Sequence, residues 1–484
     1  MSLAEKIATR QCRVGVMGLG YVGLPLALEI ARAGFHVIGL EKDDSRAGKV
    51  NNGQSYLEDV PQERLNGFVS NGQLKATTDF SVIADLDVVI MCVPTPLTKA
   101  KEPDISCIGE ACRSVAKYLG KDKLISVEST SFPTTTEGVV LPILESEGLK
   151  VGKDFYLIFS PERIDPGSKR YGVRDIPKLV GGVTPRCTEL GKLFYEQFID
   201  HVLVVSSPRV AEMAKLLENI FRCVNIALIN ELMMLSERMN IDIWEVIEAA
   251  SSKPFGFMPF YPGPGLGGHC IPVDPFFLSW KAREYDFHTQ FIELAGNINE
   301  RMPYWVVDKI SAALNTHQKS LNGSRVLLLG VAYKKDVGDV RSSPALRVIE
   351  LLADKGAEIT YHDAHVPVIT VAGRKYASAP LTRALLRESD CVAIITDHSN
   401  VDYVKVVQWS ELVVDTRGVL RHLDFSSQDL IPKHESTDYV KVIGVLTCPP
   451  KTDPDVMLDL SEKRGSKWSG KVIRQNRSSI SSGK

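Results

Sequence analysis

The pattern of hydrophobic and polar positions changes twice along the chain. In the first part, short runs rich in Val, Ile and Leu alternate with helical stretches, and turn residues bound each run. The expected strands are residues 13–18, 36–41, 87–93, 123–127 and 155–160. Alternation of this kind predicts a parallel sheet covered by helices on both faces, which is a doubly wound α/β domain.

The middle of the chain follows a helical pattern instead. From Ala211 the helical period continues for about thirty residues, far longer than an average helix. Further helical stretches follow to about Leu314. A helical block of this size suits a scaffold or a dimer interface. The strand and helix rhythm returns at Ser324, and the expected strands there are residues 325–330, 357–362, 391–396 and 412–415.

These changes predict an α/β protein in which a central helical domain joins two doubly wound, Rossmann-like domains. The expected boundaries are 1–205, 206–315 and 316–460. From about Ser461 the chain is rich in Ser, Lys, Arg and Gly, so residues 461–484 are expected to form a disordered tail. A chain of 484 residues is too long for one hydrophobic core, which agrees with this division.

Bulk properties exclude several classes of function. The formal net charge is -2, and without a basic excess the chain lacks the usual footprint of a nucleic-acid binder. No apolar stretch at the N-terminus or elsewhere has the length of a secretion signal or a membrane span, so a cytoplasmic protein is expected. The nine cysteines are scattered without a Cys-x-x-Cys pair, so neither a disulfide framework nor a metal site is expected.

A glycine-rich turn follows the first expected strand and opens a helix. In this turn, Gly18 permits a tight bend, Gly20 lets a pyrophosphate approach the backbone, and Gly23 lets the helix pack closely on the strand. The N-terminus of the helix then faces the negative charge. The turn therefore predicts a dinucleotide site.

An acidic residue completes this dinucleotide pattern. Glu41 ends the second expected strand, where a carboxylate can bind the ribose hydroxyls and repel a 2′-phosphate, which favours NAD over NADP. The nearby cations Lys42 and Arg46 weaken that preference. The alternative interpretation is a structural turn with an incidental acid.

The stretch from Gly263 to Asp274 contains four glycines and ends in a thiol followed by a carboxylate. A nucleophilic cysteine must be accessible and its thiolate must be stabilised, and a helix starting after Pro272 would help Cys270 in both respects. The alternatives are a buried cysteine beside a turn and, for Asp274, an ordinary acid at a helix N-terminus. His269 is expected to be a loop residue, because adjacent side chains usually point apart.

Polar residues form a stripe on the long expected helix. Lys215 and Asn219 lie four residues apart and share a face, and Glu212 and Arg222 fall near it. A lysine and an amide aimed at one point would stabilise an oxyanion. From the pattern alone, a solvated helix face is the favoured interpretation.

Together these motifs resemble the UDP-glucose, GDP-mannose and UDP-N-acetylhexosamine 6-dehydrogenase family over residues 12–445. The motifs that carry the resemblance, besides the glycine turn, are Pro94-Thr95-Pro96, Glu128-Ser-Thr130, Ser160-Pro-Glu162-Arg163, Glu212-x-x-Lys215-x-x-x-Asn219, Gly267-Gly268-His-Cys270 and the segment from Lys334 to Arg341-Ser-Ser-Pro344.

The resemblance implies a four-electron oxidation of a sugar C6 alcohol with NAD. Cys270 attacks the intermediate aldehyde to give a thiohemiacetal, and a second oxidation leaves a thioester that water hydrolyses. Lys215 and Asn219 hold the oxyanion, while Asp274 and Thr130 position or activate water. Glu162 is a further base for the hydrolysis.

The resemblance also implies two sets of binding residues. The cofactor residues are Gly18, Gly20, Tyr21, Val22, Gly23, Glu41, Pro94, Thr95 and Thr130. The substrate residues are Glu162, Arg163, Lys215, Asn219, Phe260, Tyr261, Gly265, Gly267, Tyr333, Lys334 and Arg341. Arg341 is expected to reach the active site of a partner subunit in a homodimer or higher oligomer. The second Rossmann-like domain lacks a full Gly-x-Gly-x-x-Gly, so it is expected to hold the nucleotide of the substrate.

One position bears on the substrate. Family members that oxidise UDP-glucose typically carry a lysine where this chain has Val273, next to Asp274. Residues 160–167 and 260–265 are similar to the UDP-N-acetylhexosamine branch, and UDP-N-acetylglucosamine is the expected substrate. UDP-N-acetylmannosamine, UDP-N-acetylgalactosamine and UDP-glucose are alternatives. A two-electron alcohol dehydrogenase and a non-catalytic NAD-binding protein are alternatives of another class.

Overall fold

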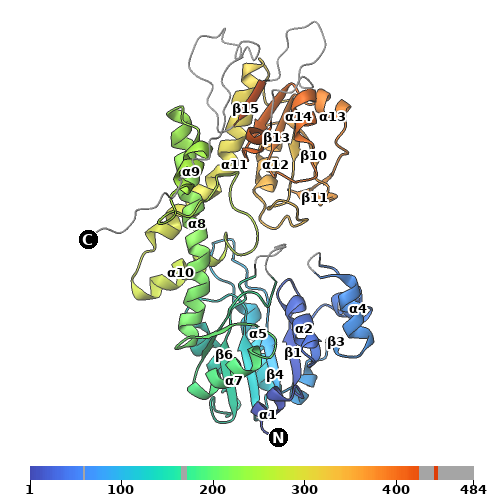
Figure 1. Cartoon of the computed structure of the whole chain (residues 1–484), viewed down its shortest axis with the longest axis vertical. Helices are drawn as coiled ribbons and strands as arrows, with labels where there is room; N and C mark the ends of the chain where they lie inside the picture. The colour runs from blue at the N-terminus through green and yellow to red at the C-terminus, as the bar shows by residue number, and fades with distance from the viewer. Residues whose placement is uncertain (58–59, 165–171, 424–440, 445–484) are drawn as a thin grey trace, which may run out of the picture. The chain divides into compact units, whose positions relative to one another are not determined.

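The computed structural model describes residues 1–57, 60–164, 172–423 and 441–444 (Figure 1). The expected tail, residues 461–484, lies outside the described residues. So does the end of the motif at residues 160–167.

The first part of the chain forms an eight-stranded sheet with the strand order β3-β2-β1-β4-β5-β6-β7-β8. Its strands are β1 (Arg13–Met17), β2 (His36–Leu40), β3 (Leu74–Thr77), β4 (Val88–Met91), β5 (Lys123–Val127), β6 (Phe155–Phe159), β7 (Lys178–Gly182) and β8 (Val202–Val204). Strands β1 to β6 are parallel, and β7 runs antiparallel to β6. All five expected strands are present, whereas β3, β7 and β8 were not expected.

Successive residues of one strand enter two different cores because side chains alternate across a sheet. Val88 and Ile90 of β4 join one cluster of buried side chains, and Val89 and Met91 join another. The helices that cover the sheet are α1 (Leu3–Ala8), α2 (Gly23–Arg32), α3 (Asp44–Asn51), α4 (Gln62–Ser70), α5 (Ser106–Tyr118), α6 (Leu141–Leu144) and α7 (Pro185–Tyr195). The predicted doubly wound arrangement is therefore confirmed.

The helical block follows this domain. It consists of α8 (Pro208–Arg238), α9 (Ile243–Ser251), α10 (Asp274–Ala282) and α11 (Gln290–Thr316). Helix α8 has 31 residues and begins with a proline, which needs no backbone hydrogen bond at that position. It packs on α11, where Asn230 donates to the Asn299 Oδ1 at 2.9 Å and Asn299 donates to the Cys223 carbonyl at 3.2 Å. The expected long helix is confirmed.

The second sheet is smaller and wholly parallel, with the order β10-β9-β13-β14-β15. Its strands are β9 (Arg325–Leu329), β10 (Glu358–His362), β13 (Cys391–Ile394), β14 (Leu412–Asp415) and β15 (Lys441–Gly444). An antiparallel hairpin, β11 (Val368–Val371) and β12 (Arg374–Ala377), lies beside it. The helices here are α12 (Pro344–Asp354), α13 (Arg383–Glu388) and α14 (Tyr403–Trp409).

Four short helical turns complete the described elements. They are η1 (Phe80–Asp85), η2 (Thr136–Val140), η3 (Arg283–Tyr285) and η4 (Val419–His422). Over the described part of the chain, no helix combines the length and the apolar character that crossing a membrane requires.

Candidate active site

The glycine turn between β1 and α2 has the geometry that a pyrophosphate needs. A Cβ on Gly18, whose φ is +88°, would lie 2.6 Å from the Cys92 carbonyl oxygen, and a Cβ on Gly23 would lie 1.9 Å from the Gly18 carbonyl oxygen. Both glycines are therefore required by the fold itself. A Cβ on Gly20 would meet nothing within 4 Å. This open space beside the backbone is where a pyrophosphate would come close.

Glu41 lies at the carboxyl end of β2 and is almost fully buried. Its carboxylate accepts hydrogen bonds from the backbone N–H of Leu19 at 3.1 Å and of Lys42 at 2.9 Å. The two nearby cations are both paired, Arg46 with Glu41 at 3.3 Å and Lys42 with Glu110 at 2.5 Å. Because carboxylates neutralise both cations, neither offers a free partner to a 2′-phosphate, which strengthens the preference for NAD.

Pro94 and Thr95 follow β4, next to this turn in the sheet order, and Thr95 is buried. Tyr21 lies within the turn and is 42% exposed. The guanidinium of Arg341 lies 3.9 Å from the centre of the Tyr21 ring. Arg341 therefore contacts the glycine turn of its own chain, and its reach to a partner subunit stays a prediction.

The cysteine loop, residues Gly263 to Asp274, is fixed by its backbone at several points. The Gly263 N–H donates to Asn230 Oδ1 at 3.0 Å, and the Gly268 N–H donates to the Arg341 carbonyl at 2.9 Å. A Cβ on Gly267 would lie 2.4 Å from the Cβ of Tyr333. The glycines of this loop therefore permit close packing against the segment that carries Tyr333 and Arg341.

Cys270 closes the loop at the start of α10. Its carbonyl accepts the N–H groups of Val273 at 3.1 Å and Asp274 at 2.8 Å, which turns the chain into the helix. Burial raises the pKa of the Cys270 thiol, and the charge of Asp274 adds to this rise, whereas the cations Lys215 and Arg341 oppose it. The resting side chain is therefore a thiol, and it lies in the electrostatic field of both a carboxylate and a lysine.

Residues of α8 meet the cysteine loop and the loop after β5. Lys215 is 7% exposed and its Nζ donates to the Thr130 Oγ1 at 2.6 Å. Asn219 donates from Nδ2 to Asp274 Oδ2 at 2.7 Å. The structure therefore brings these four predicted residues and Cys270 together. Burial of Lys215 excludes the solvated-face interpretation.

Asp274 has the properties of a general base. It is 1% exposed, and its Oδ1 has no hydrogen-bond partner among the described residues. Burial raises the pKa of Asp274 to about 6, against the opposing effects of Lys215 and the Asn219 hydrogen bond. A carboxylate with a free oxygen and a pKa near neutrality can accept a proton from water or from a thiol.

Glu162 has a different environment. Its Oε2 accepts Lys178 Nζ at 2.9 Å, and its Oε1 accepts the N–H groups of Arg163 at 2.7 Å and Ile164 at 2.9 Å. Burial raises the pKa of Glu162, but Lys178 and these hydrogen bonds outweigh it, so the net pKa is lowered. Both oxygens are thus occupied and the carboxylate is a weak base, which favours a positioning role over proton transfer.

Lys178, which the sequence analysis did not identify, links two functional loops. It is 3% exposed and also binds Glu128 at 2.7 Å, and Glu128 accepts a hydrogen bond from Tyr195. Glu128 begins the loop of Thr130, so one buried cation joins that loop to the loop of Glu162. The only signal in the sequence was a lysine at the start of an apolar run, which no motif distinguishes.

The two other stripe residues, Glu212 and Arg222, differ in burial. Glu212 is buried and accepts the N–H groups of Thr134 at 2.7 Å and Thr136 at 2.9 Å, so it supports the loop after Thr130. Burial raises the pKa of Glu212 to about 7. Arg222 is exposed.

Some expected substrate residues pack on other aromatic side chains. Tyr261 stacks on Trp244 with ring centres 5.5 Å apart, and Phe260 meets Phe221 edge to face at 5.6 Å. Arg163 binds Glu218 at 2.6 Å and the Pro177 carbonyl. These contacts occupy the three side chains, and their place in the substrate site stays a prediction.

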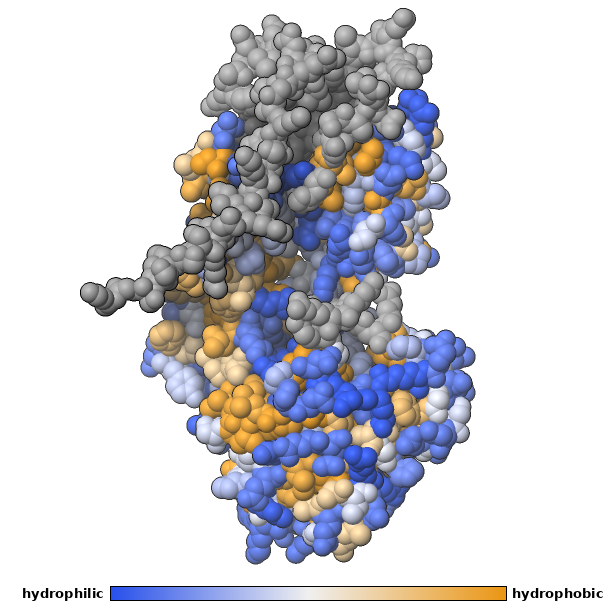
Figure 2. Space-filling view, in the orientation of Figure 1, coloured by the Kyte–Doolittle hydropathy of each residue, from blue (hydrophilic) through white to orange (hydrophobic). Residues whose placement is uncertain are grey.

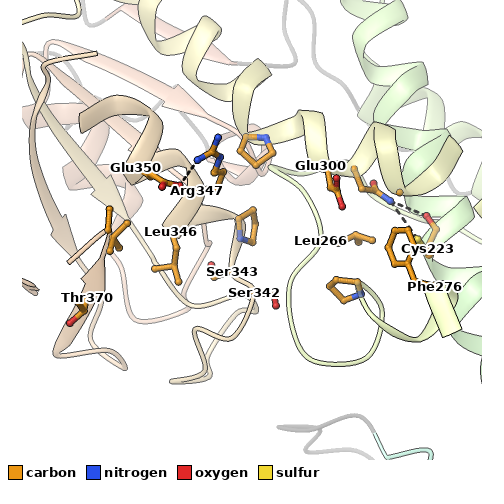
Figure 3. Close-up of a pocket in the computed structure, with 17 residues that line it drawn as sticks. Cys223, Leu266, Phe276, Glu300, Ser342, Ser343, Leu346, Arg347, Glu350 and Thr370 are labelled. Carbon is orange, nitrogen blue, oxygen red and sulfur yellow. Dashed lines mark hydrogen bonds and ion pairs between the residues drawn. The ribbon is translucent and has the colours of Figure 1, made fainter. Parts of the chain in front are cut away.

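A cavity of about 450 Å³ lies behind the cysteine loop, between α11 and α12 (Figure 3). Leu266 and Pro272 of the loop line it together with Phe276, Glu300 and Arg347. Cys270 and Lys215 are not among its lining residues. The cavity therefore lies outside the cluster of reactive groups, and the chemistry is assigned to the side of the loop that faces α8.

Family models cover the three domains. The NAD-binding domain of the UDP-glucose/GDP-mannose dehydrogenase family matches residues 12–199, its central domain matches residues 209–301, and its UDP-binding domain matches residues 327–422.

Known proteins are similar over most of the chain. The UDP-N-acetyl-D-mannosamine dehydrogenase of Pyrococcus horikoshii is 32% identical, over 84% of this chain and 96% of that protein. The UDP-N-acetyl-D-glucosamine 6-dehydrogenase of Pseudomonas aeruginosa is 36% identical, over 73% of this chain and 83% of that protein. A solved structure of the UDP-D-ManNAc dehydrogenase from Pyrococcus horikoshii has a TM-score of 0.76 at 30% identity, over 90% of this chain and 99% of that one.

The glycine turn, the cysteine loop bound to the long central helix α8 and the second parallel sheet thus occur in one chain together with all three domain matches. The chain belongs to the UDP-glucose/GDP-mannose dehydrogenase family and is an NAD-dependent nucleotide-sugar dehydrogenase.

Proposed function

We propose that the protein oxidises the C6 alcohol of UDP-N-acetylglucosamine to the carboxylate, with Cys270 as the covalent catalyst. The observation that carries the chemistry is the cluster of Lys215, Asn219 and Asp274 around Cys270, with one carboxylate oxygen free. Because the thiol can hold the aldehyde, one site can complete both oxidations without releasing a reactive intermediate.

The choice of sugar rests on motif likeness. Val273 stands where UDP-glucose enzymes typically carry lysine, and the two proteins named UDP-N-acetyl-D-glucosamine 6-dehydrogenase are 36% and 33% identical. The mannosamine epimer is the second candidate, because UDP-N-acetyl-D-mannosamine dehydrogenases match a larger share of the chain. The two sugars differ only in the configuration at C2.

The chain's own residues have distinct roles in the oxidation. Gly20 and Glu41 would hold NAD, which would supply the hydride acceptor for both oxidations at C6. Lys215 and Asn219 donate to the oxygen on C6 whenever it carries negative charge. Asp274 removes the proton of the Cys270 thiol as sulfur bonds to the aldehyde carbon, which gives the thiohemiacetal. The second oxidation turns this adduct into a thioester on Cys270.

Hydrolysis of the thioester requires an activated water. We assign this base to Asp274, because its Oδ1 is free and its pKa is about 6, whereas both oxygens of Glu162 are occupied. Thr130, bound to Lys215 at 2.6 Å, positions the water. The water oxygen bonds to the carbonyl carbon, the carbon–sulfur bond breaks, and the proton returns to sulfur.

The nucleotide is assigned to the loop after β9. Tyr333 and Lys334 lie on this loop, within the segment that matches the UDP-binding domain, and Tyr333 packs against the cysteine loop. Arg341, beside Tyr21 and Asp339, adds positive charge between the two nucleotide sites. Residues 1–205, 206–315 and 316–460 are the proposed limits of the three domains.

A second copy of the chain is proposed to cover one face of α8. Seven apolar residues of this helix are 37–59% exposed, namely Val210, Met213, Leu217, Phe221, Leu228, Leu232 and Leu235. Their spacing of three, four or seven residues places them on one face, and Figure 2 shows apolar surface in the region of this helix. An exposed apolar stripe of this length is typical of helices that pair with another helix.

The test is the number of NADH molecules formed per sugar. The protein is mixed with excess NAD and a limiting amount of UDP-N-acetylglucosamine, and NADH is counted by its absorbance. Two NADH per sugar are expected, and Cys270→Ala should abolish the second. One NADH per sugar, unaffected by Cys270→Ala, would indicate a simple alcohol dehydrogenase.

The same count is made with the mannosamine, galactosamine and glucose forms. The proposed sugar should have the highest kcat/KM, and a higher value for the mannosamine form would reassign the substrate within the family. NAD binding without reduction by any of the four would indicate a non-catalytic protein.

A further inference from the structure

Two buried residues of the second sheet, Asp363 and His398, bind each other at the carboxyl ends of β10 and β13. His398 Nε2 lies 3.0 Å from Asp363 Oδ2, and the two residues are 1% and 2% exposed. Neither belongs to the reactive cluster around Cys270. The pair lies at the edge of the second sheet, where the nucleotide of the substrate is expected.

Asp363 holds the start of the loop that carries Tyr333 and Lys334. Its Oδ2 accepts the N–H of Val331 at 2.7 Å and the N–H of Ala332 at 3.1 Å. Burial raises the pKa of Asp363, but the hydrogen bonds from His398 and the backbone outweigh this effect, so the pKa is lowered and the group is a carboxylate.

His398 holds the other end of the same loop. Its Nδ1 accepts the backbone N–H of Asp336 at 2.9 Å. Asp336 has a φ of +59°, a backbone conformation that needs such support, and its carboxylate accepts the Ser399 N–H at 2.7 Å. Since Nδ1 accepts a hydrogen bond from a backbone N–H, it carries no proton, so Nε2 carries the proton and donates to Asp363.

The hydrogen bonds around Gly330 repeat those around Gly18 in the glycine turn of the first domain, with one addition. In both domains a glycine with positive φ ends the first strand, Gly18 and Gly330, and its N–H donates to the end of the second strand. In both, an acid after that second strand accepts the next N–H, Glu41 from Leu19 and Asp363 from Val331. Only the second domain adds a histidine that ties the acid to the far end of the loop.

A metal-ion site is an alternative interpretation of the residues around His398, but the hydrogen bonds argue against it. Asp336, His365 and His398 offer ligand atoms within 4.8 Å of one another. However, both ring nitrogens of His398 already have hydrogen-bond partners, so neither has a lone pair directed at an ion. The cluster therefore acts through its hydrogen bonds.

We infer that Asp363 and His398 are positioning residues that preform the loop from Val331 to Asp336 for the nucleotide of the substrate. This inference rests on the proposed assignment of Tyr333 and Lys334 to that nucleotide. A loop held at both ends before binding loses less conformational entropy when the nucleotide arrives. Loss of either hydrogen bond of His398 should therefore weaken nucleotide binding without changing the chemistry at Cys270.

The test uses two substitutions that each keep one half of the ring. His398→Asn keeps an acceptor near the place of Nδ1 and removes the donor to Asp363, whereas His398→Gln keeps a donor near the place of Nε2 and removes the acceptor. Each should raise the Kd of UDP, measured by calorimetry, by roughly tenfold, the effect of one lost buried hydrogen bond. Each should also raise the KM for the UDP-sugar at nearly unchanged kcat, and the Kd of NAD should stay constant.

His365→Asn is the matched control. The His365 ring lies beside the His398 ring, with centres 4.9 Å apart, but the loop amides bind Asp363 and His398 and not the His365 ring. It should leave the Kd of UDP unchanged. Unchanged UDP binding in both His398 variants, with only a lower melting temperature, would reduce the pair to a structural role and overturn the inference.

Lys334→Ala tests the proposed assignment of the loop to the nucleotide separately from the inference about Asp363 and His398. If wild-type protein binds UDP and Lys334→Ala binds it equally well, the assignment of the loop to the nucleotide is wrong.

Hydrogen exchange on the wild-type protein is a second test, and it does not depend on whether a variant folds. The amides of Val331, Ala332 and Asp336 should be protected before UDP is added, and protection that appears only with UDP would contradict a preformed loop.

Discussion

Among the single residues of the site, Asp274, the proposed base, shows how a buried charge lowers the stability of the fold. Its carboxylate is 1% exposed and only one of its oxygens has a hydrogen-bond partner in the described structure. Burial raises the pKa to about 6 from an ordinary value of 3.8. The folded protein therefore binds the proton of Asp274 more tightly than the unfolded chain does.

This difference predicts a pH-dependent effect of Asp274→Asn on stability. Below pH 3.8 the group is neutral in both states, and its stabilising contribution is lost as the pH rises through 6. Two pKa units correspond to about 3 kcal/mol. The free energy of unfolding of the variant relative to wild type should therefore rise by about that amount between pH 4 and pH 8. Urea unfolding at several pH values measures it, and parallel curves would contradict the pKa.

Lys178 illustrates the opposite case, a buried charge that the fold requires. It binds Glu128 and Glu162 at 2.7 and 2.9 Å, and Lys178→Met would leave two buried carboxylates without their cation. The expected loss in the free energy of unfolding is about 3–5 kcal/mol. Lys192→Met, which removes an exposed pair with Glu196, should change it by less than about 1 kcal/mol. Equal effects of the two substitutions would show that the buried network does not stabilise the fold.

At the scale of the elements, periodicity predicted the strands that carry continuous apolar runs. Strands β5 and β14 match their expected limits, because Val, Ile and Leu fill them between turn residues. Strand β7 was missed because its apolar run, Leu179 and Val180, is short and is followed at once by Gly181 and Gly182. The β11–β12 hairpin was also missed, although Ala372 and Gly373, both with positive φ, form the turn that an alternating pattern could have suggested.

The sequence predicted only those residues of the site that belong to recognisable motifs. The cysteine loop, Lys215, Asn219 and Asp274 were identified from their residue types and from the family resemblance. Hydrogen-bond partners then separated Asp274 from Glu162 as a base, because Lys178 and two backbone N–H groups occupy Glu162 while one oxygen of Asp274 is free, and no spacing in the sequence contains that information. The contacts of Phe260 and Tyr261 with Phe221 and Trp244 likewise depend on tertiary packing.

The glycine turn allows a prediction that separates binding from folding. Gly20→Ala adds a methyl group in open space, so the melting temperature should stay near that of the wild type. The same methyl group should obstruct the pyrophosphate and raise the Kd of NAD by at least about tenfold. Gly48→Ala, in helix α3 with no neighbour within 4 Å, is the matched control and should leave NAD binding unchanged. A Gly20→Ala protein that binds NAD normally would place the cofactor elsewhere.

For the whole molecule, the exposed face of α8 is the surface proposed to pair two copies of the chain. Leu217 and Leu228 are 59% and 50% exposed on that face. Replacing both with Glu should convert a dimer into a monomer in sedimentation experiments, because buried charges without partners destabilise an interface. Lys75→Glu, an exposed site on β3, should leave the sedimentation coefficient unchanged. A wild-type protein that is monomeric at all concentrations would refute the proposed partner surface.

The raised pKa of Cys270 has a consequence for the lifetime of the enzyme. Peroxides and alkylating agents attack the thiolate, and burial keeps this sulfur protonated while no substrate is present. In the proposed mechanism, Asp274 removes this proton only when an aldehyde is there to be captured. Without substrate, the protonated sulfur is thus less open to oxidation, and the proposed nucleophile is preserved.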